Sequence, residues 1–251
     1  MADTVSFLGL DFTPLDSQAL LKAVTARATA GSFGYLVTPN VDHMVRLTAD
    51  PELMPLYRDA WMLVSDSRIL QTLAARSGLT LPAAPGSDLA AALLDRVIRP
   101  DEPVTVIGGD EGLIAELRAR YGLTDIRWHA PPMGLRRNPA AVAEAAAFVV
   151  NSPARFHFLC VGSPQQEMVA RAAAAMGGGQ GVGLCLGASL DFLTGKAERA
   201  PRWMQQARLE WLHRLASEPG RMWKRYLVEG PRIFAIWWQW HTARNRLEVQ
   251  A

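Results

Sequence analysis

Polar side chains that could take part in catalysis follow the short apolar runs of this 251-residue sequence. Asp66 comes directly after one such run, WMLVS. Burial disfavours the charged form of a carboxyl group, so an aspartate at the end of a buried strand can act as a general base. The alternative is that Asp66 caps the helix that follows it. Thr38 and Asn40 follow another run and could orient a hydroxyl group, or could form a turn around Pro39.

Glycines at two places could let a phosphate group approach backbone N–H groups at the start of a helix. One place is Gly108-Gly109, and the other is the series Gly181, Gly183 and Gly187. Tight turns between a strand and a helix are the commoner reason for such glycines. Neither place has the G-x-G-x-x-G spacing of a dinucleotide site, and Lys196 does not complete a phosphate-binding P-loop. A nucleotide-binding oxidoreductase is therefore the weaker alternative.

Metal and thiol chemistry find little support in the sequence. It contains no D-x-D pair and no H-E-x-x-H motif, and its five histidines are scattered along the chain. Cys160 and Cys185 lie inside apolar runs, which indicates buried thiols of a protein in a reducing compartment. We therefore expect no bound metal and no cofactor. In any phosphate chemistry, we expect cationic side chains and backbone dipoles, rather than a bound divalent ion, to offset the charge.

Short strand patterns alternate with helical patterns over most of the chain. This alternation predicts an α/β fold: a Rossmann-like, mainly parallel sheet with helices on both faces. Ligands bind such sheets beyond the carboxyl ends of the strands, where the polar residues are found. Ser87 is expected to cap the helix that begins at Asp88, and Asn138-Pro139 to start another. The expected strands are 5–10, 34–40, 61–66, 104–109, 155–162 and 181–187, and the expected helices are 17–30, a stretch through Met44 and Leu47, 69–76, 88–98, 112–121, 139–150 and 165–176.

The C-terminal segment differs from the rest of the chain. From Lys196 onward basic residues outnumber acidic ones, and the segment holds six of the eight tryptophans. No part of it has the roughly 20 uninterrupted apolar residues of a membrane-spanning helix. Trp and Arg on amphipathic helices suit the surface of a membrane, although packing against the body or in a dimer interface explains the tryptophans as well. We therefore expect a catalytic domain over 1–200 and a membrane-associating helical appendage over 201–251.

Charge and the N-terminus bear on partners and location. The net charge of +2 argues against nucleic acid binding, and residues 1–12 lack the basic and apolar regions of a secretion signal. We expect a cytoplasmic protein held at the inner face of the cell membrane. Exposed tryptophan faces also favour self-association into a homo-oligomer.

Seven motifs follow one another along the chain: TPN, SD, GSDL, VIGG, GSPQQE, GASLDFLTGKAERAPRWMQ and LEWLHRLASEPGRMWKRYL. In this order they resemble the motifs of the WecG/TagA/CpsF glycosyltransferases, which form glycosyltransferase family 26. The resemblance covers about positions 5 to 235 and is most specific from Gly187 to Leu227. It implies an inverting, metal-independent transfer of a sugar from a UDP-sugar to a glycan acceptor linked to undecaprenyl diphosphate, a polyprenyl carrier.

The resemblance also implies roles for individual residues. Asp66 matches the family's proposed general base, and Thr38 and Asn40 match residues of the donor and acceptor pocket. Gln166 and Glu167 match a site expected to contact the nucleotide-sugar. The C-terminal segment would bring arginines to the active site as it docks at the membrane, and the candidates are Arg214, Arg221 and Arg225. The further substrate-binding candidates are Gly108, Gly109, Ser87, Asp88, Gly187 and Asp191.

Two departures from the family pattern bear on the substrate. Ser67 follows Asp66 where many relatives have glycine, and Ala83-Ala84-Pro85 stands where many have an arginine. The second departure removes a phosphate or acceptor contact, so hexose, N-acetylmannosamine and N-acetylmannosaminuronic acid donors all remain open. The rival functions are a nucleotide-binding oxidoreductase and a non-catalytic membrane-binding scaffold.

Overall fold

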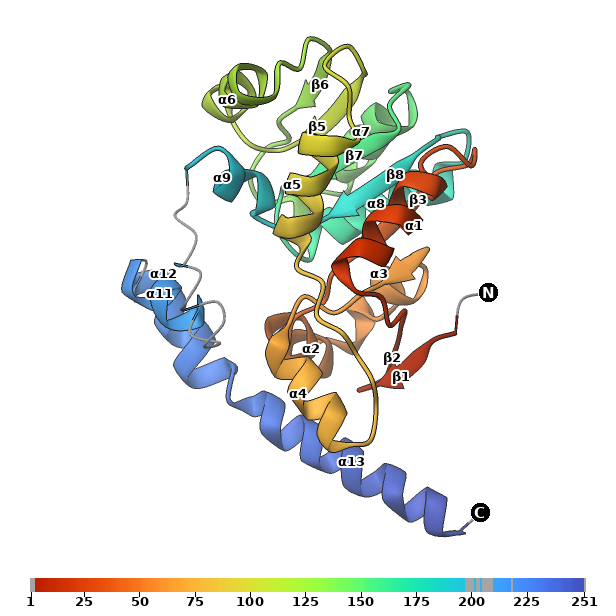
Figure 1. Ribbon diagram of the computed structural model, residues 1–251, viewed down its shortest axis with the longest axis vertical. Coiled ribbons are helices and arrows are strands. Elements are labelled where there is room, and N and C mark those ends of the chain that lie inside the picture. Colours follow the sequence, from red (N-terminus) through yellow and green to blue (C-terminus); the bar gives the residue numbers. More distant parts are fainter. Residues whose placement is uncertain (1–2, 197–200, 202–203, 205–209, 218, 251) are drawn as a thin grey trace.

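A six-stranded parallel sheet forms the centre of the protein, in the strand order β4-β3-β8-β7-β5-β6 (Figure 1). The computed structural model describes residues 3–196, 201, 204, 210–217 and 219–250. All four residues of β3, β5, β7 and β8 are buried, as expected for strands covered on both faces. The strands are β3 (Gly34–Val37), β4 (Met62–Leu63), β5 (Val104–Ile107), β6 (Ile126–His129), β7 (Phe156–Leu159) and β8 (Val182–Cys185).

Helices cover both faces of the sheet and form two separate apolar cores, so the predicted α/β, Rossmann-like fold is confirmed. One core joins the sheet to α1 (Ser17–Arg27), α5 (Gly86–Arg96), α6 (Glu111–Tyr121) and α9 (Ser189–Leu193). The other core joins the opposite face to α2 (Val41–Ala49), α3 (Pro55–Arg58), α4 (Arg68–Arg76), α7 (Pro139–Val150) and α8 (Gln165–Met176), with the short 3-10 turns η1 (Pro51–Leu53) and η2 (Leu135–Arg137).

The N-terminal residues form a hairpin instead of the single strand predicted over 5–10. β1 (Val5–Phe7) and β2 (Leu10–Phe12) pair antiparallel, with Phe7 opposite Leu10. Leu8 and Gly9 both have positive φ, 51° and 83°, which produces the tight turn typical of two-residue hairpins. The hairpin is a sheet of its own and buries Phe7 and Phe12 against the core that contains α2 and α4.

Two other local predictions were wrong. The helix predicted over 17–30 ends at Arg27. The second is an omission, because strand β6 was not predicted. Its sequence, IRWH, is short and polar, as expected for a strand at the edge of the sheet. The predicted start at Asn138-Pro139 is confirmed, because the Asn138 side chain accepts a hydrogen bond from the Ala141 N–H (3.1 Å) and Pro139 occupies the first turn.

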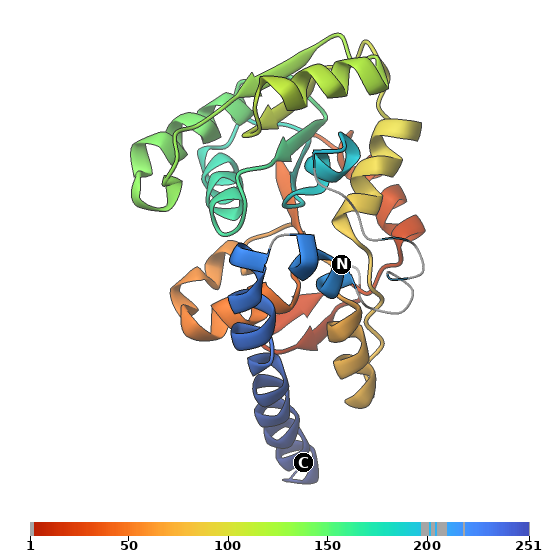
Figure 2. The same cartoon turned by 90° about the vertical axis from the view of Figure 1, so that its left-hand side faces the viewer.

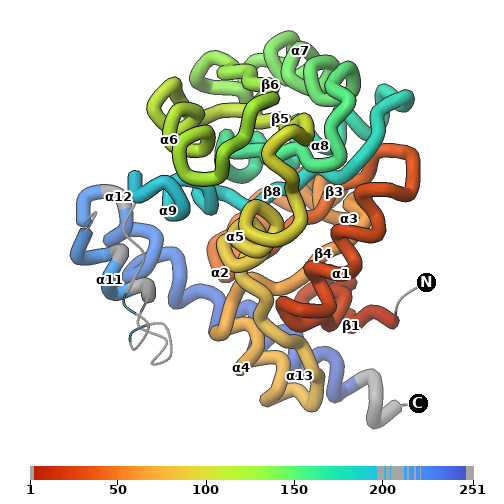
Figure 3. The backbone as a smooth tube through the Cα atoms, turned by 45° about the horizontal axis from the view of Figure 1, so that its top comes forward, coloured from red at the N-terminus to blue at the C-terminus, as the bar shows by residue number. Residues whose placement is uncertain are grey.

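The C-terminal segment forms α11 (Glu210–Ser217), α12 (Pro219–Trp223), a π-helical turn η3 (Lys224–Glu229) and the long helix α13 (Arg232–Gln250). Figure 1 shows α13 running past α2 and α4, and Figure 2 shows its C-terminal half extending beyond the body. The tube in Figure 3 shows α11 and α12 on the side of the molecule opposite the C-terminus. Parts of the predicted helical appendage, residues 202–203, 205–209, 218 and 251, lie outside the described part of the chain, as does the end of the predicted catalytic domain at 200.

One face of α13 packs tightly on the body. Ile233 is buried, and the Trp237 Nε1–H donates a hydrogen bond to the Ser77 hydroxyl at the end of α4 (2.9 Å). The Trp240 ring meets Phe7 edge to face at 5.1 Å. On the other face Phe234 and Trp238 are exposed. Among the described residues, no helix combines the length and the apolar character that crossing a membrane requires.

Candidate active site at the carboxyl ends of the strands

The carboxyl ends of β3, β8 and β7, which are neighbours in the sheet, bring the predicted polar residues together. Thr38 is buried directly after β3, and Asn40 is half-buried two residues later. The Asn40 side chain caps α2 by accepting a hydrogen bond from the Asp42 N–H (3.0 Å), so its structural role is a helix cap and not merely a turn. This cap does not exhaust Asn40, because its side-chain NH₂ group still has donors for a ligand.

Asp66 lies beside this strand end. Its backbone N–H donates a hydrogen bond to the Pro39 carbonyl (3.0 Å), and its side chain is half-buried. The alternative that Asp66 caps α4 is wrong, because the cap is Ser67, whose hydroxyl accepts a hydrogen bond from the Leu70 N–H (3.3 Å). Asp66 therefore lies beyond the carboxyl end of β4, at the ligand edge of the sheet, and Ser67 instead of Asp66 caps the helix.

The start of α5 closes one side of the site. Gly86 packs so closely that a Cβ there would lie 3.2 Å from the Thr38 hydroxyl, and it is the first residue of the helix. Ser87 does not cap α5, contrary to the prediction: Pro85 holds the cap position and makes no side-chain cap. Ser87 and Asp88 lie in the first turn and are half-buried, close to the strand end through Gly86.

The segment 83–85 lies directly alongside Asp66. The Ala84 N–H donates a hydrogen bond to the Ser65 carbonyl (2.8 Å), and Ser65 and Ala83 form a parallel bridge. Ala84 itself is fully buried. The place where the family pattern favours an arginine is thus occupied by small apolar side chains next to the candidate base, which leaves the cationic groups of the site to other parts of the chain.

Two of the glycines expected to receive a phosphate have their N–H groups already in use. The Gly108 N–H donates to the His129 carbonyl (2.8 Å), and the Gly187 N–H donates to Gln166 Oε1 (3.1 Å). Gly108 also packs tightly, since a Cβ would lie 2.8 Å from Val161 Cγ1. Packing therefore explains Gly108, and these two amides do not form the predicted phosphate cradle.

The remaining glycines lie away from the centre of the site. Gly109 has φ +73° at the end of β5, two strands from β8, and the next residue, Asp110, caps α6. Gly181 precedes β8 and Gly183 lies within it, at the end of the sheet opposite the site. Asp191 is half-buried in the first turn of α9, after β8.

Gln166 and Glu167 are buried at the start of α8, with exposed fractions of 1% and 0%. Gln166 Nε2 donates to Glu167 Oε1 (2.7 Å), so Gln166 links the carboxylate to Gly187. Burial raises the pKa of Glu167 to about 7, and the hydrogen bond from Gln166 opposes this rise. Glu167 Oε2 is buried and has no hydrogen-bond partner within the described residues. In this structure both side chains therefore hold the strand ends in place from inside the protein.

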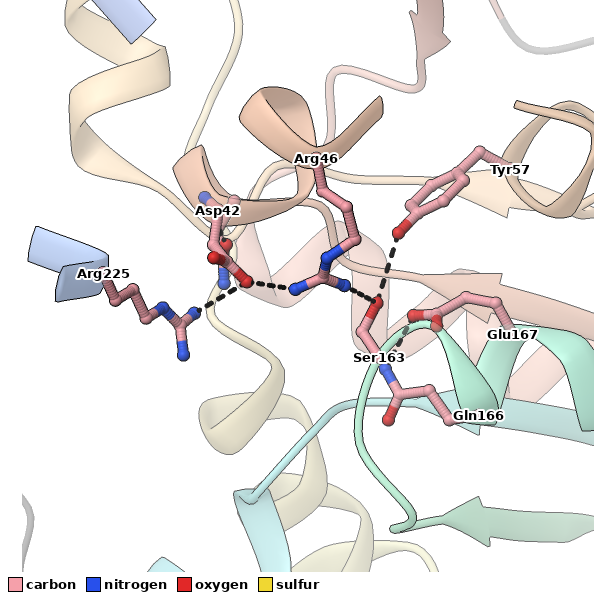
Figure 4. A network of polar contacts seen from close by, with 8 residues as sticks. Asp42, Arg46, Tyr57, Ser163, Gln166, Glu167 and Arg225 are labelled. Atoms are coloured by element: carbon pink, nitrogen blue, oxygen red, sulfur yellow. Dashed lines mark hydrogen bonds and ion pairs between the residues drawn. The ribbon is translucent and has the colours of Figure 1, made fainter. Parts of the chain in front are cut away.

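A polar network beside this buried pair extends from Ser163 to the C-terminal segment (Figure 4). Arg46 on α2 donates to the Ser163 hydroxyl from Nη1 (2.9 Å) and to Asp42 Oδ2 from Nη2 (2.5 Å). The Tyr57 hydroxyl lies 3.3 Å from Ser163 Oγ, in the turn before α8. Arg225 Nη2, from η3, lies 3.5 Å from the same Asp42 oxygen.

Sequence reasoning missed Asp42, Arg46 and Tyr57. The first two had a detectable signal, because acidic and basic residues four positions apart on a helix form an ion pair. Tyr57 had none. Of the three predicted arginines, Arg225 reaches the network; Arg214 and Arg221 lie on α11 and α12, and their side chains are outside the described part of the structure.

Within the parts of the chain that the structure describes, no group of three or more His, Cys, Asp or Glu residues is arranged to hold a metal ion. Cys185 is buried and Cys160 half-buried, and burial raises the pKa of the Cys160 thiol to about 12. Both thiols are thus held in their neutral, unreactive form.

Polar residues thus gather at the carboxyl edge of a parallel sheet with helices on both faces, the arrangement of an α/β protein with its ligand site at the strand ends. The model of the glycosyl transferase WecG/TagA/CpsF family matches residues 5–247. The chain belongs to this family, and its class is that of the glycosyltransferases. Membership implies a nucleotide-sugar donor and a glycan acceptor, and it favours glycosyl transfer over oxidoreduction.

Proposed function

We propose that the protein transfers a sugar from a UDP-sugar to a glycan acceptor linked to a polyprenyl diphosphate, with inversion at the anomeric carbon and without a metal ion. The observation that carries this proposal is the position of Asp66. Its half-buried carboxylate lies at the strand-end site, with its backbone N–H bonded to Pro39 between Thr38 and Asn40. Family membership supplies the reaction class, and this carboxylate supplies the base.

In the proposed step the Asp66 carboxylate takes the proton of the acceptor hydroxyl. The hydroxyl oxygen forms a bond to the anomeric carbon from the face opposite the nucleotide, and the bond from that carbon to the diphosphate oxygen breaks. UDP leaves with the electron pair of the broken bond. Thr38 and Asn40 would orient the sugar or the acceptor hydroxyl through hydrogen bonds.

The charge on the leaving diphosphate requires stabilisation by cations, because the Gly108 and Gly187 amides are occupied. Arg225 is the described arginine of the C-terminal segment that contacts the network beside the site. Fixed cationic groups that face developing negative charge lower the barrier by several kcal/mol in a site shielded from water. We assign this role to Arg225, together with Arg214 and Arg221 from the preceding helices.

We also propose that the C-terminal segment lies on the inner face of the cell membrane. The support is the clustering of exposed apolar side chains. Eight large apolar residues are exposed in the described part of the chain, and six of these lie between 212 and 238. Such a patch with Trp residues and interspersed arginines fits a lipid surface. The six are Leu212, Trp223, Leu227, Val228, Phe234 and Trp238.

The decisive experiment offers the full-length protein a panel of UDP-sugars with polyprenyl-diphosphate-linked oligosaccharides and follows sugar transfer. Asp66→Asn should lower kcat by about 100-fold or more, since a general base contributes 10²- to 10⁴-fold. The same variant should keep its thermal stability and its stabilisation by UDP. Asp59→Asn is the matched control, because Asp59 precedes β4 at the opposite end and pairs with Arg171 on the surface (2.6 Å). Transfer by Asp66→Asn at the normal rate would refute the assignment.

A further inference from the structure

Asp42 is the point at which the C-terminal segment meets the strand-end site. Its backbone N–H donates a hydrogen bond to the side chain of Asn40 (3.0 Å), a residue that lies two positions after Thr38. Its Oδ2 atom accepts a hydrogen bond from Arg46 Nη2 (2.5 Å) and lies 3.5 Å from Arg225 Nη2. The Asp42 side chain is only 18% exposed, so the two ion pairs are partly shielded from solvent. A single carboxylate oxygen therefore holds two guanidinium groups.

The charges of this cluster do not balance. Arg46 and Arg225 bring two positive charges and Asp42 brings one negative charge, which leaves one positive charge in excess. Arg225 Nε is buried and has no hydrogen-bond partner within the described residues. A buried N–H group without an acceptor costs free energy, which an anionic ligand would recover. The Arg225 Nε–H can therefore donate a hydrogen bond to an anion, while Asp42 pairs with Nη2 of the same guanidinium group.

The backbone around Arg225 fixes it from the other side. The Gly230 N–H donates to the Arg225 carbonyl (2.8 Å), which closes the wide turn of η3. A Cβ at Gly230 would lie 3.0 Å from that carbonyl oxygen and 3.2 Å from the Tyr226 carbonyl oxygen. A side chain at this position would therefore crowd the turn, and π-helical turns are frequent at functional sites.

We propose that Asp42 is a positioning residue that holds Arg225 beside the strand-end site and, through Arg46, couples that arginine to Ser163 in the turn before α8. The inference rests on the proposed function, because it takes Arg225 to face the leaving diphosphate. The ligand class is therefore a nucleoside diphosphate, whose charge grows as the bond to the sugar breaks. Asp42 acts on this charge only through Arg225.

A double-mutant cycle on the full-length enzyme tests the coupling. Asp42→Asn should lower kcat on the order of tenfold with little change in the KM for the donor, because the arginine acts on charge that develops in the transition state. Asp42→Asn should have no further effect in an Arg225→Ala background, whereas Asp42→Glu should retain most of the activity. Equal effects of Asp42→Asn in both backgrounds would overturn the proposal, as would failure of Asp42→Glu to rescue.

A second measurement does not depend on turnover. Amide hydrogen exchange across residues 224–230 should become faster in Asp42→Asn and stay unchanged in Asp50→Asn. Asp50 is the matched control, since it lies at the other end of α2 and pairs with Arg136 (3.0 Å). If no donor supports transfer, the proposed function fails while the exchange experiment still decides the role of Asp42. Unchanged exchange in Asp42→Asn would overturn that role.

Discussion

The buried carboxyl group of Glu167 should make the stability of the protein depend on pH in a way that one substitution removes. Glu167 is fully buried at the start of α8, and burial raises its pKa from the ordinary value of 4.5 to about 7. Gln166 Nε2 donates a hydrogen bond to its Oε1 atom (2.7 Å). Glutamine in its place keeps the size and an acceptor for this bond, but it cannot ionise.

The direction of this pH dependence follows from the number of protons bound in the folded and in the unfolded state. Between pH 4.5 and about 7 the folded protein keeps the Glu167 proton, whereas the unfolded chain has lost it. The Glu167 contribution to the free energy of unfolding is therefore greatest below pH 4.5 and falls as the pH rises to about 7. At about 1.4 kcal/mol per pKa unit, the loss over this range is about 3 kcal/mol. The Glu167→Gln variant should not show this loss of stability, because glutamine does not ionise.

Two buried histidines make the free energy of unfolding rise with pH, which is opposite to the effect of Glu167. The effect of Glu167 must therefore be measured as the difference between the wild type and a Glu167 variant. Burial lowers the pKa of His43 to about 3 and that of His157 to about 4, from the ordinary value of 6.5. The contribution of both histidines to stability is therefore fully present above pH 6.5. Their contribution is lost as the pH falls through 6.5 toward these lower values. It is the same in the wild type and in Glu167→Gln, and it cancels in the difference.

Urea unfolding followed by far-UV circular dichroism at about pH 5 and about pH 8 measures this difference. The stability of Glu167→Gln relative to wild type should rise by about 2 to 3 kcal/mol from the lower to the higher pH. Glu116→Gln, at an exposed position on α6, is the control and should show no such change. A difference between Glu167→Gln and wild type that is the same at both pH values would show that Glu167 is already ionised in the folded protein.

Three further predictions concern the packing of the sheet and of α13. Gly181→Ala should cost about 3 kcal/mol in urea unfolding, because its Cβ would lie 2.5 Å from the Arg155 carbonyl oxygen at φ +80°; a cost below about 1 kcal/mol would contradict this clash. Glu102→Gln should cost about 2 to 3 kcal/mol, because Glu102 is buried and receives two hydrogen bonds from Arg155 (2.6 and 2.7 Å); unchanged thermal stability would argue against it. Trp238→Ala should weaken sedimentation with anionic vesicles at unchanged melting temperature, whereas Trp237→Ala, on the packed face, should lower the melting temperature; equal behaviour of the two variants would contradict the two-faced arrangement of α13.

Much of the fold was predictable because its signals are local. Buried strands such as VTVI and FHFL are continuous apolar runs, and the helices between them carry their own caps, as at Asn138. The hairpin at Leu8-Gly9 was missed because the apolar run VSFLGL continues through the turn. Strand β6 was missed because an edge strand is not buried along its length and so lacks the apolar run.

The candidate site was predictable only in part. Thr38, Asn40 and Asp66 lie within three residues of the end of a strand, so the rule that ligands bind beyond strand ends locates them. The burial of Glu167 and the hydrogen bond from the Gly187 N–H to Gln166 depend on how α8 packs against β8. That bond joins residues 21 positions apart in the chain. The contact between Arg46 and Ser163 spans 117 residues. Pairings of this kind arise from packing between elements and leave no periodic pattern.

The order of apolar and polar residues by itself determined that this chain forms a parallel sheet with helices on both faces and that polar residues, Asp66 among them, lie where the strands end. Those features follow from local burial and from the direction of the strands. Only the tertiary structure decided which polar groups remain available there. It used the Gly108 and Gly187 amides for internal hydrogen bonds, enclosed Glu167, and placed Arg225 on Asp42. A hydrogen-bonding group can serve a ligand only when the fold has not already supplied its partner.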